Sequence, residues 1–267
     1  MTELLNAKPL RRRFRVYAFD PAASVSLETA VVNDAVIELD WERRWEEPVG
    51  IGPSNEYLEV IDYDQSCQCF YEPLDPNHPW LLAQDGLPPA EGNPQFHQQM
   101  VFAVAMKTIR NFERALGRPV FWALPSDDPR KANDEPYPPF TRRLRIYPHA
   151  LRQSNAYFSP AKGALMFGYF KSKPRHENDE GYWIFTCLSQ DIIAHETVHA
   201  ILHGIRRRAV EAVNADSLAF HEGFSDVVAL LQHFTMSEVV AHELARTGGE
   251  LRNESLLNGL ASKVRFR

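Results

Sequence analysis

One long amphipathic segment, residues 93–119, divides the sequence and limits the folds available to it. The segment reads NPQFHQQMVFAVAMKTIRNFERALGRP. Asn93 can cap a helix and Pro94 suits its first turn, while Gly117 and Pro119 stop it. Its apolar residues recur every three or four positions, which is typical of a helix with an apolar face. The sequence therefore predicts a long helix here that other elements must cover.

Short segments with strand character lie on both sides of this helix. Before it, four segments are rich in β-branched and aromatic residues: FRVYAF, SVSLETAVV, AVIELDW and YLEVIDY. After it come VFWAL, RLRIYPH, NAYFSP and GALMFGYF, and beyond Gly181 helical periodicity dominates. A β-rich part followed by a helical part predicts the α+β class. We expect a β-rich segment at 1–92, a lobe at 93–247 and the start of a further helical region at 248–267.

Composition excludes several classes of function. The net charge of −6 argues against a general nucleic-acid-binding protein. No segment is long and apolar enough to span a membrane, and the first residues lack the apolar core of a signal peptide. Three cysteines are too few, and odd in number, for a disulfide framework. We therefore expect a cytoplasmic protein with free thiols and with no nucleic-acid or membrane partner.

The segment IAHETVHAIL, residues 193–202, places two histidines four positions apart. Ser189 can cap a helix there and Gly204 can end it. Residues four apart share a helix face, so His195 and His199 can point at one metal ion. From these residues alone, a metal site and two histidines on a polar face remain equally open.

A catalytic zinc ion needs a third protein ligand. The extended motif H-E-x-x-H-x-x-G-x-x-H is excluded, because Leu202 and Ile205 occupy its last two positions. A second helix is expected at 214–234, where Glu222 and Asp226 lie one turn apart. Buried carboxylates need partners, and a zinc ion and the N–H of a ligating histidine would supply them.

The same periodicity predicts the start and the apolar face of this second helix. We expect Asp216 or Ser217 to cap it. Its apolar residues recur on one face. They are Phe220, Phe224, Val227, Val228, Leu231 and Phe234.

DIIAHETVHAIL followed by AFHEGFSDVVALL resembles the thermolysin-like gluzincin zinc metallopeptidases, which carry H-E-x-x-H on one helix and E-x-x-x-D on the next. The match spans roughly residues 93–240 and implies a thermolysin-like zincin lobe that binds Zn²⁺. The resemblance also implies a role for each motif residue. The zinc ligands would be His195, His199 and Glu222, the general base Glu196, and the outer partner of His195 would be Asp226.

A third segment, SNAYFSPAKGALMFGYF, resembles the strand at the edge of that family's active site. The resemblance implies that Asn155 and Ala156 bind the backbone of a peptide or protein substrate. An ordinary strand after a turn is the alternative interpretation. The G-A-M-E-N strand of the related aminopeptidases is absent, which favours an endopeptidase.

The sequence also departs from the family pattern. His221 replaces the asparagine that often precedes the glutamate ligand, and residues 200–221 contain no tyrosine to stabilise an oxyanion. The final LLNGLASKVRFR resembles an unfinished helix, so we expect an incomplete C-terminal lobe and weak activity from this chain alone. The alternative function is a weak or inactive gluzincin-like lobe that serves as a peptide-binding or scaffold module. Glu196 favours the peptidase, because a scaffold has no need of it.

Overall fold

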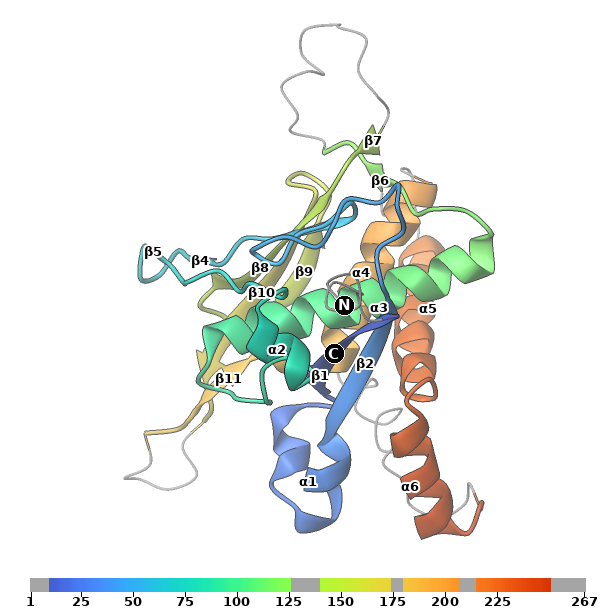
Figure 1. Cartoon of the computed structure of the whole chain (residues 1–267). Coiled ribbons are helices and arrows are strands. Elements are labelled where there is room, and N and C mark those ends of the chain that lie inside the picture. Colours follow the sequence, from blue (N-terminus) through green and yellow to red (C-terminus); the bar gives the residue numbers. More distant parts are fainter. Residues whose placement is uncertain (1–9, 126–139, 174–179, 207–214, 251–267) are drawn as a thin grey trace, which may run out of the picture.

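The computed structural model describes residues 10–125, 140–173, 180–206 and 215–250 (Figure 1). Within them helices and strands are mixed, which confirms the α+β class. Residues 207–214, in the connection between the two motif helices, lie outside the described residues. So do residues 251–267, which make up most of the expected C-terminal region.

The predicted long helix is α3, Pro94–Leu116, and both of its end signals are confirmed. The Asn93 side chain accepts a hydrogen bond from the backbone N–H of Gln95 at 3.0 Å, and Gly117 ends the helix with a φ of 66°. Every residue from 96 to 106 is buried, so this half of α3 is covered on all sides. It packs against strands and against helix α4, and Figure 1 shows it crossing the molecule as the green helix.

The main sheet has the order β11-β10-β8-β3, and β9 also pairs with β10. Its strands are β3 (Leu58–Val60), β8 (Leu144–Leu151), β9 (Ala156–Ser159), β10 (Ala164–Lys171) and β11 (Trp183–Phe185). β8 runs parallel to both β3 and β10, whereas β9 and β11 run antiparallel to β10. β9 pairs with residues 164–167 of β10 and β11 with residues 169–171. The two short strands therefore follow one another along β10.

The N-terminal part is less β-rich than the sequence predicts. β1 (Arg11–Tyr17) and β2 (Asp34–Asp40) confirm two of the predicted strands, and they pair antiparallel. The predicted strand SVSLETAVV is wrong, because the short helix α1, Leu27–Asn33, occupies most of it. Asn33 fixes the end of this helix, since its side-chain amide donates to the carbonyl of Asp20 at 2.7 Å and its oxygen accepts from the N–H of Phe19 at 3.0 Å.

The remaining short elements connect these parts. They are the 3₁₀ helix η2 (Pro21–Ser24), β4 (Tyr63–Asp64), β5 (Cys69–Phe70), α2 (Pro79–Ala83), β6 (Trp122–Ala123), β7 (Phe140–Thr141) and the 3₁₀ helix η4 (Thr186–Leu188). One buried core includes residues from both sides of position 93, among them Phe14 and Phe102, whose rings make an edge contact. The division of the chain at that position stays a prediction.

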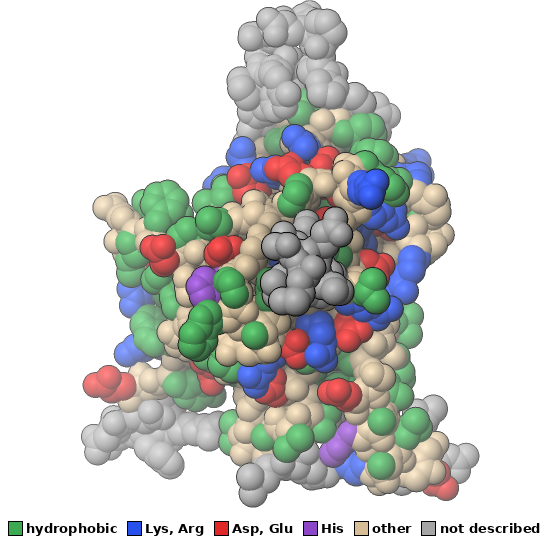
Figure 2. Space-filling view, in the orientation of Figure 1, with side chains coloured by type: hydrophobic (Ala, Val, Ile, Leu, Met, Phe, Trp, Pro, Cys, Tyr) green, Lys and Arg blue, Asp and Glu red, His purple; other side chains and the backbone are tan. Residues whose placement is uncertain are grey.

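Charged side chains of both signs are interspersed on the face shown in Figure 2. Several form ion pairs, and the pair between Arg110 and Glu46 is largely buried with an N–O distance of 2.9 Å. Within the described ranges, no helix is both long and apolar enough to cross a membrane.

Three helices form the C-terminal part of the described chain: α4 (Gln190–Ile205), α5 (Ala215–His233) and α6 (Ser237–Thr247). Ser189 occupies the capping position of α4, but its side chain makes no capping hydrogen bond. Three other predicted end signals are wrong. Gly204 lies inside α4, and both Asp216 and Ser217 lie inside α5.

The apolar face of α5 is not the face that the structure buries. Phe220 is 60% exposed and Leu231 is 57% exposed. The side of the helix that is buried instead carries polar residues, including His221 and Ser225. This side faces α4, against which α5 packs. The inner face of α5 is therefore polar because it meets the histidines of α4.

Gly204 has a packing function that explains its place inside a helix. A Cβ atom at this position would lie 2.0 Å from the carbonyl oxygen of Phe121, next to β6. The missing side chain therefore allows β6 to lie directly against α4. At Gly223 in α5, by contrast, an added Cβ meets nothing within 4 Å.

We predict opposite effects for alanine at these two helical glycines. Gly204→Ala should lower the free energy of unfolding by about 1–3 kcal/mol, because the methyl group overpacks a rigid backbone contact. Gly223→Ala should raise it by up to about 1 kcal/mol, because alanine is the better helix former. Urea denaturation of both variants and the wild type measures the two changes. Equal effects at both positions would contradict the packing argument.

Candidate metal centre

The two histidines of α4 point at a common place beside α5. The Nε2 atoms of His195 and His199 lie 2.9 Å apart. Glu222 of α5 completes the group, with one carboxylate oxygen 3.2 Å from Nε2 of His195 and the other 3.5 Å from Nε2 of His199. The structure therefore brings together the three residues that the sequence motif predicts as zinc ligands.

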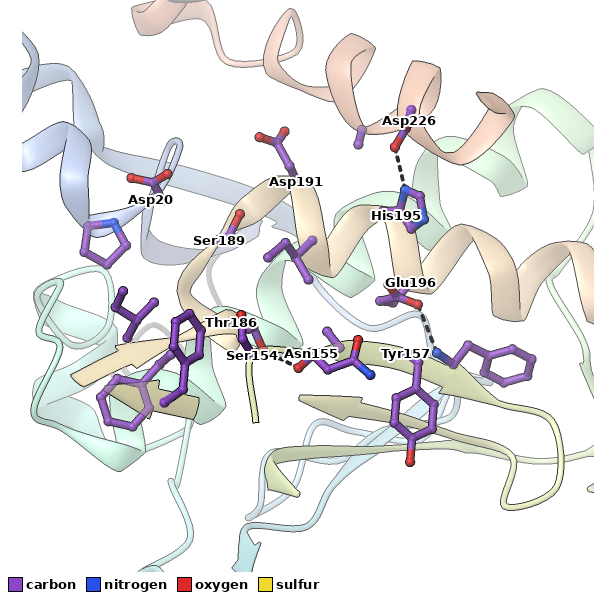
Figure 3. Close-up of a pocket in the computed structure, with 18 of the residues that line it drawn as sticks. Asp20, Ser154, Asn155, Tyr157, Thr186, Ser189, Asp191, His195, Glu196 and Asp226 are labelled. Carbon is purple, nitrogen blue, oxygen red and sulfur yellow. Dashed lines mark hydrogen bonds and ion pairs between the residues drawn. The ribbon is translucent and has the colours of Figure 1, made fainter. Parts of the chain in front are cut away.

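The outer nitrogens of the two rings have partners that orient them. Nδ1 of His195 lies 2.8 Å from Oδ1 of Asp226, the residue expected to hold it (Figure 3). Nδ1 of His199 lies 3.4 Å from the hydroxyl of Ser225. Ser225 was not predicted from the sequence, although its place three residues after Glu222 puts it near the same helix face.

Hydrogen bonding and burial make these rings suitable for a metal ion. An ionised carboxylate accepts only, so the contact with Asp226 keeps the proton of His195 on Nδ1 and leaves a lone pair on Nε2. Burial, together with the neighbouring His195 and His221, lowers the pKa of His199 to about 3. His199 is therefore neutral near pH 7. Two imidazoles and a carboxylate are a donor set that suits Zn²⁺.

Glu196 lies in the same helix turn as His195 and is nearly buried, with 6% of its surface exposed. One of its carboxylate oxygens accepts a hydrogen bond from the backbone N–H of Phe158 in β9 at 2.9 Å (Figure 3). The carboxylate is thereby held between α4 and the edge strand. It lines the same cleft as the three expected ligands.

The expected substrate-binding residues lie at the beginning of β9. Asn155 is exposed and directly precedes the strand, and Ala156 is its first residue. The N–H groups of alternate residues in a strand point to the same side. Because the N–H of Phe158 points to Glu196, the backbone of Ala156 faces α4 as well. Both residues line the cleft.

The cleft itself has a volume of about 1360 Å³. This exceeds the roughly 300–1,000 Å³ that is usual for small-molecule sites. Apolar side chains line much of it, among them Ile184, Phe185 and Leu230. The volume and the lining can accommodate a chain segment with apolar side chains.

His221, which stands where the family pattern often has an asparagine, lies against His199. Its ring stacks on that of His199, with the centroids 5.7 Å apart, and it is 4% exposed. Its Nε2 has no hydrogen-bond partner within the described part of the chain.

Two tyrosines that line the cleft, Tyr157 and Tyr182, come from outside residues 200–221. In Figure 3 the ring of Tyr157 extends away from α4.

Comparison with known proteins adds no relative. No protein-family model matches the chain, and a search of curated proteins finds no match. The resemblance to the gluzincins therefore depends on the motif residues and their geometry.

Proposed function

We propose that this protein is a zinc-dependent peptidase with a thermolysin-like zincin lobe. The observation that carries the proposal is the convergence of His195, His199 and Glu222 on one point, with Glu196 in the next position of the same helix. Asp226 strengthens it, because a carboxylate behind a ligating histidine is a recurrent feature of zinc sites.

The residues of the site would then have separate roles in hydrolysis. Zinc bound there would polarise the scissile carbonyl and lower the pKa of water. Glu196 takes a proton from the attacking water and passes it to the departing amine. The hydrogen bond from Phe158 orients the Glu196 carboxylate for both transfers.

The edge strand indicates how the substrate binds. An extended peptide can add to a free strand edge through backbone hydrogen bonds. Ala156 offers its backbone on the side of β9 that faces α4, so a peptide paired there lies along the cleft next to Glu196. Such binding needs no free terminus, which agrees with an endopeptidase.

A peptide library tests the proposal directly. The protein is purified without chelators, its zinc content is measured, and it is incubated with mixed peptides whose products are identified by mass spectrometry. We expect internal cleavages that stop when a zinc chelator is added and return when zinc is restored. Bound zinc without any cleavage would instead favour a peptide-binding module, and no zinc at His195 and His199 would refute the site.

A further inference from the structure

A second pair of histidines faces a cysteine elsewhere in the protein. His97 lies in α3, His149 in β8 and Cys187 in η4. Their side chains are almost completely buried, with exposed fractions of 1%, 2% and 0%. One donor atom from each lies within 4.8 Å of the other two. None of the three contributes to the proposed peptidase site.

The two rings are held so that their inner nitrogens face each other, with Nδ1 of His97 2.8 Å from Nε2 of His149. Nε2 of His97 lies 2.8 Å from the carbonyl oxygen of Glu91. Nδ1 of His149 lies 2.6 Å from Oδ1 of Asp62. A carbonyl and an ionised carboxylate accept only, so each outer nitrogen carries the proton of its ring.

This arrangement leaves a lone pair on each inner nitrogen, and the two lone pairs point at one another. A proton or a metal ion must lie between them. The same feature marks the pair formed by His195 and His199, where the nitrogens are 2.9 Å apart and an outer carboxylate also holds one ring. The two histidine pairs are thus alike in geometry.

A shared proton or a metal ion would each offset the charge of the Asp62 carboxylate, but only a metal ion would also engage the thiol of Cys187. Asp62 is 5% exposed, and its other oxygen accepts a hydrogen bond from Gln98 at 2.9 Å. Within the part of the chain that the structure describes, no lysine or arginine forms an ion pair with it. A divalent ion bound by the Cys187 thiolate would balance both negative charges, as a buried group of charges requires.

The protonation states agree with this. Burial, and next the neighbouring His149, lower the pKa of His97 to about 3, so the ring is neutral and can donate a lone pair. Burial raises the pKa of the Cys187 thiol. A metal ion must therefore displace the thiol proton, which leaves to the solvent as the metal–sulfur bond forms.

We propose that His97, His149 and Cys187 form a second metal site, which takes a divalent ion that prefers nitrogen and sulfur ligands, such as Zn²⁺. Aromatic rings close the site, since Phe185 packs on both histidines and Tyr169 packs on His149. Because its three donors are almost completely buried, the site is closed to substrates and would have a structural role. The ion would link α3, β8 and η4, and η4 ends two residues before Gln190 begins α4. It would thus fix the start of the helix that carries His195 and Glu196.

Cobalt distinguishes this site from the peptidase site, because only the new site contains a cysteine. The full chain is refolded with excess Co²⁺ and desalted without oxygen. We expect about two cobalt ions per chain and a thiolate-to-cobalt charge-transfer band in the near ultraviolet. Cys187→Ser should abolish the band and lower the cobalt content to about one ion per chain.

Two controls separate the sites. The double variant Cys67→Ser/Cys69→Ser should keep the band, because neither cysteine is one of the three converging donors. His195→Ala should lose one cobalt ion but keep the band, so failure of the peptidase site cannot imitate failure of this one. A folded wild-type protein that binds cobalt without the band would overturn the proposal whether or not Cys187→Ser folds. A band that survives in Cys187→Ser would overturn it too.

Discussion

Replacing Glu196 by glutamine is expected to lower kcat by about 10²–10⁴-fold, the usual contribution of a positioned proton-transfer group. The loss is expected because an amide cannot take a proton from water near pH 7. Zinc content should stay unchanged, since Glu196 is not one of the three converging ligands. The fold should also persist, because the glutamine oxygen can still accept the N–H of Phe158.

Steady-state kinetics with a peptide found in the library measure this loss, and elemental analysis accompanies them. Glu238→Gln is the matched control, since this exposed residue in the first turn of α6 lies outside the cleft. It should keep the activity of the wild type. An active Glu196→Gln variant would show that another group takes the proton, and the proposed mechanism would have to be abandoned.

The second large effect is expected at Asp226. Asp226→Ala should weaken zinc binding by about 10–100-fold, the range seen when the outer partner of a ligating histidine is removed. Without the carboxylate 2.8 Å away, Nδ1 of His195 no longer has the acceptor that keeps its proton there. The proton can then move to Nε2, the nitrogen that the metal needs.

Competition with a chromophoric chelator measures the change. Zinc binding at the His195 site should weaken, whereas zinc binding at the proposed site of His97, His149 and Cys187 should stay the same. Ser225→Ala should have a smaller effect, because its hydroxyl lies 3.4 Å from His199. Asp216→Ala is the control from the first turn of the same helix. An unchanged zinc affinity in Asp226→Ala would mean that this carboxylate only sits beside the site.

Local signals allowed a large part of the fold to be predicted. Asn93, Pro94 and Gly117 marked both ends of α3, and each lies where the structure places a helix end. The strand predicted for the segment that forms α1 was wrong, because a short run of alternating β-branched residues fits a strand or a helix equally well. Contacts of the Asn33 side chain with residues 19 and 20 decide it in favour of a helix, and no local pattern contains them.

The motif spacing also predicted the cluster around His195, because its members lie on two consecutive helices. Periodicity did not predict which face of α5 is buried. It identifies which residues share a face, but not which face is buried. The polar face of α5 is inside because it meets His195 and His199, and Phe220 is left outside.

The second histidine pair could not be predicted from the sequence at all. His97, His149 and Cys187 come from three elements far apart in the chain. Only the packing of α3, β8 and η4 brings them together. No spacing rule covers such a group, in contrast to histidines one helical turn apart.

In the proposed peptidase, the hydrogen bond between Phe158 and Glu196 limits how the edge strand can bind the backbone of a substrate. Of the two backbone N–H groups that β9 directs toward α4, the one on Phe158 is already engaged by the base, which leaves that of Ala156. A peptide paired with this edge would therefore lose one of the backbone hydrogen bonds that every sequence can make. In the proposed peptidase, more of the discrimination between substrates would then come from their side chains in the apolar part of the cleft, and we expect selective rather than indiscriminate cleavage.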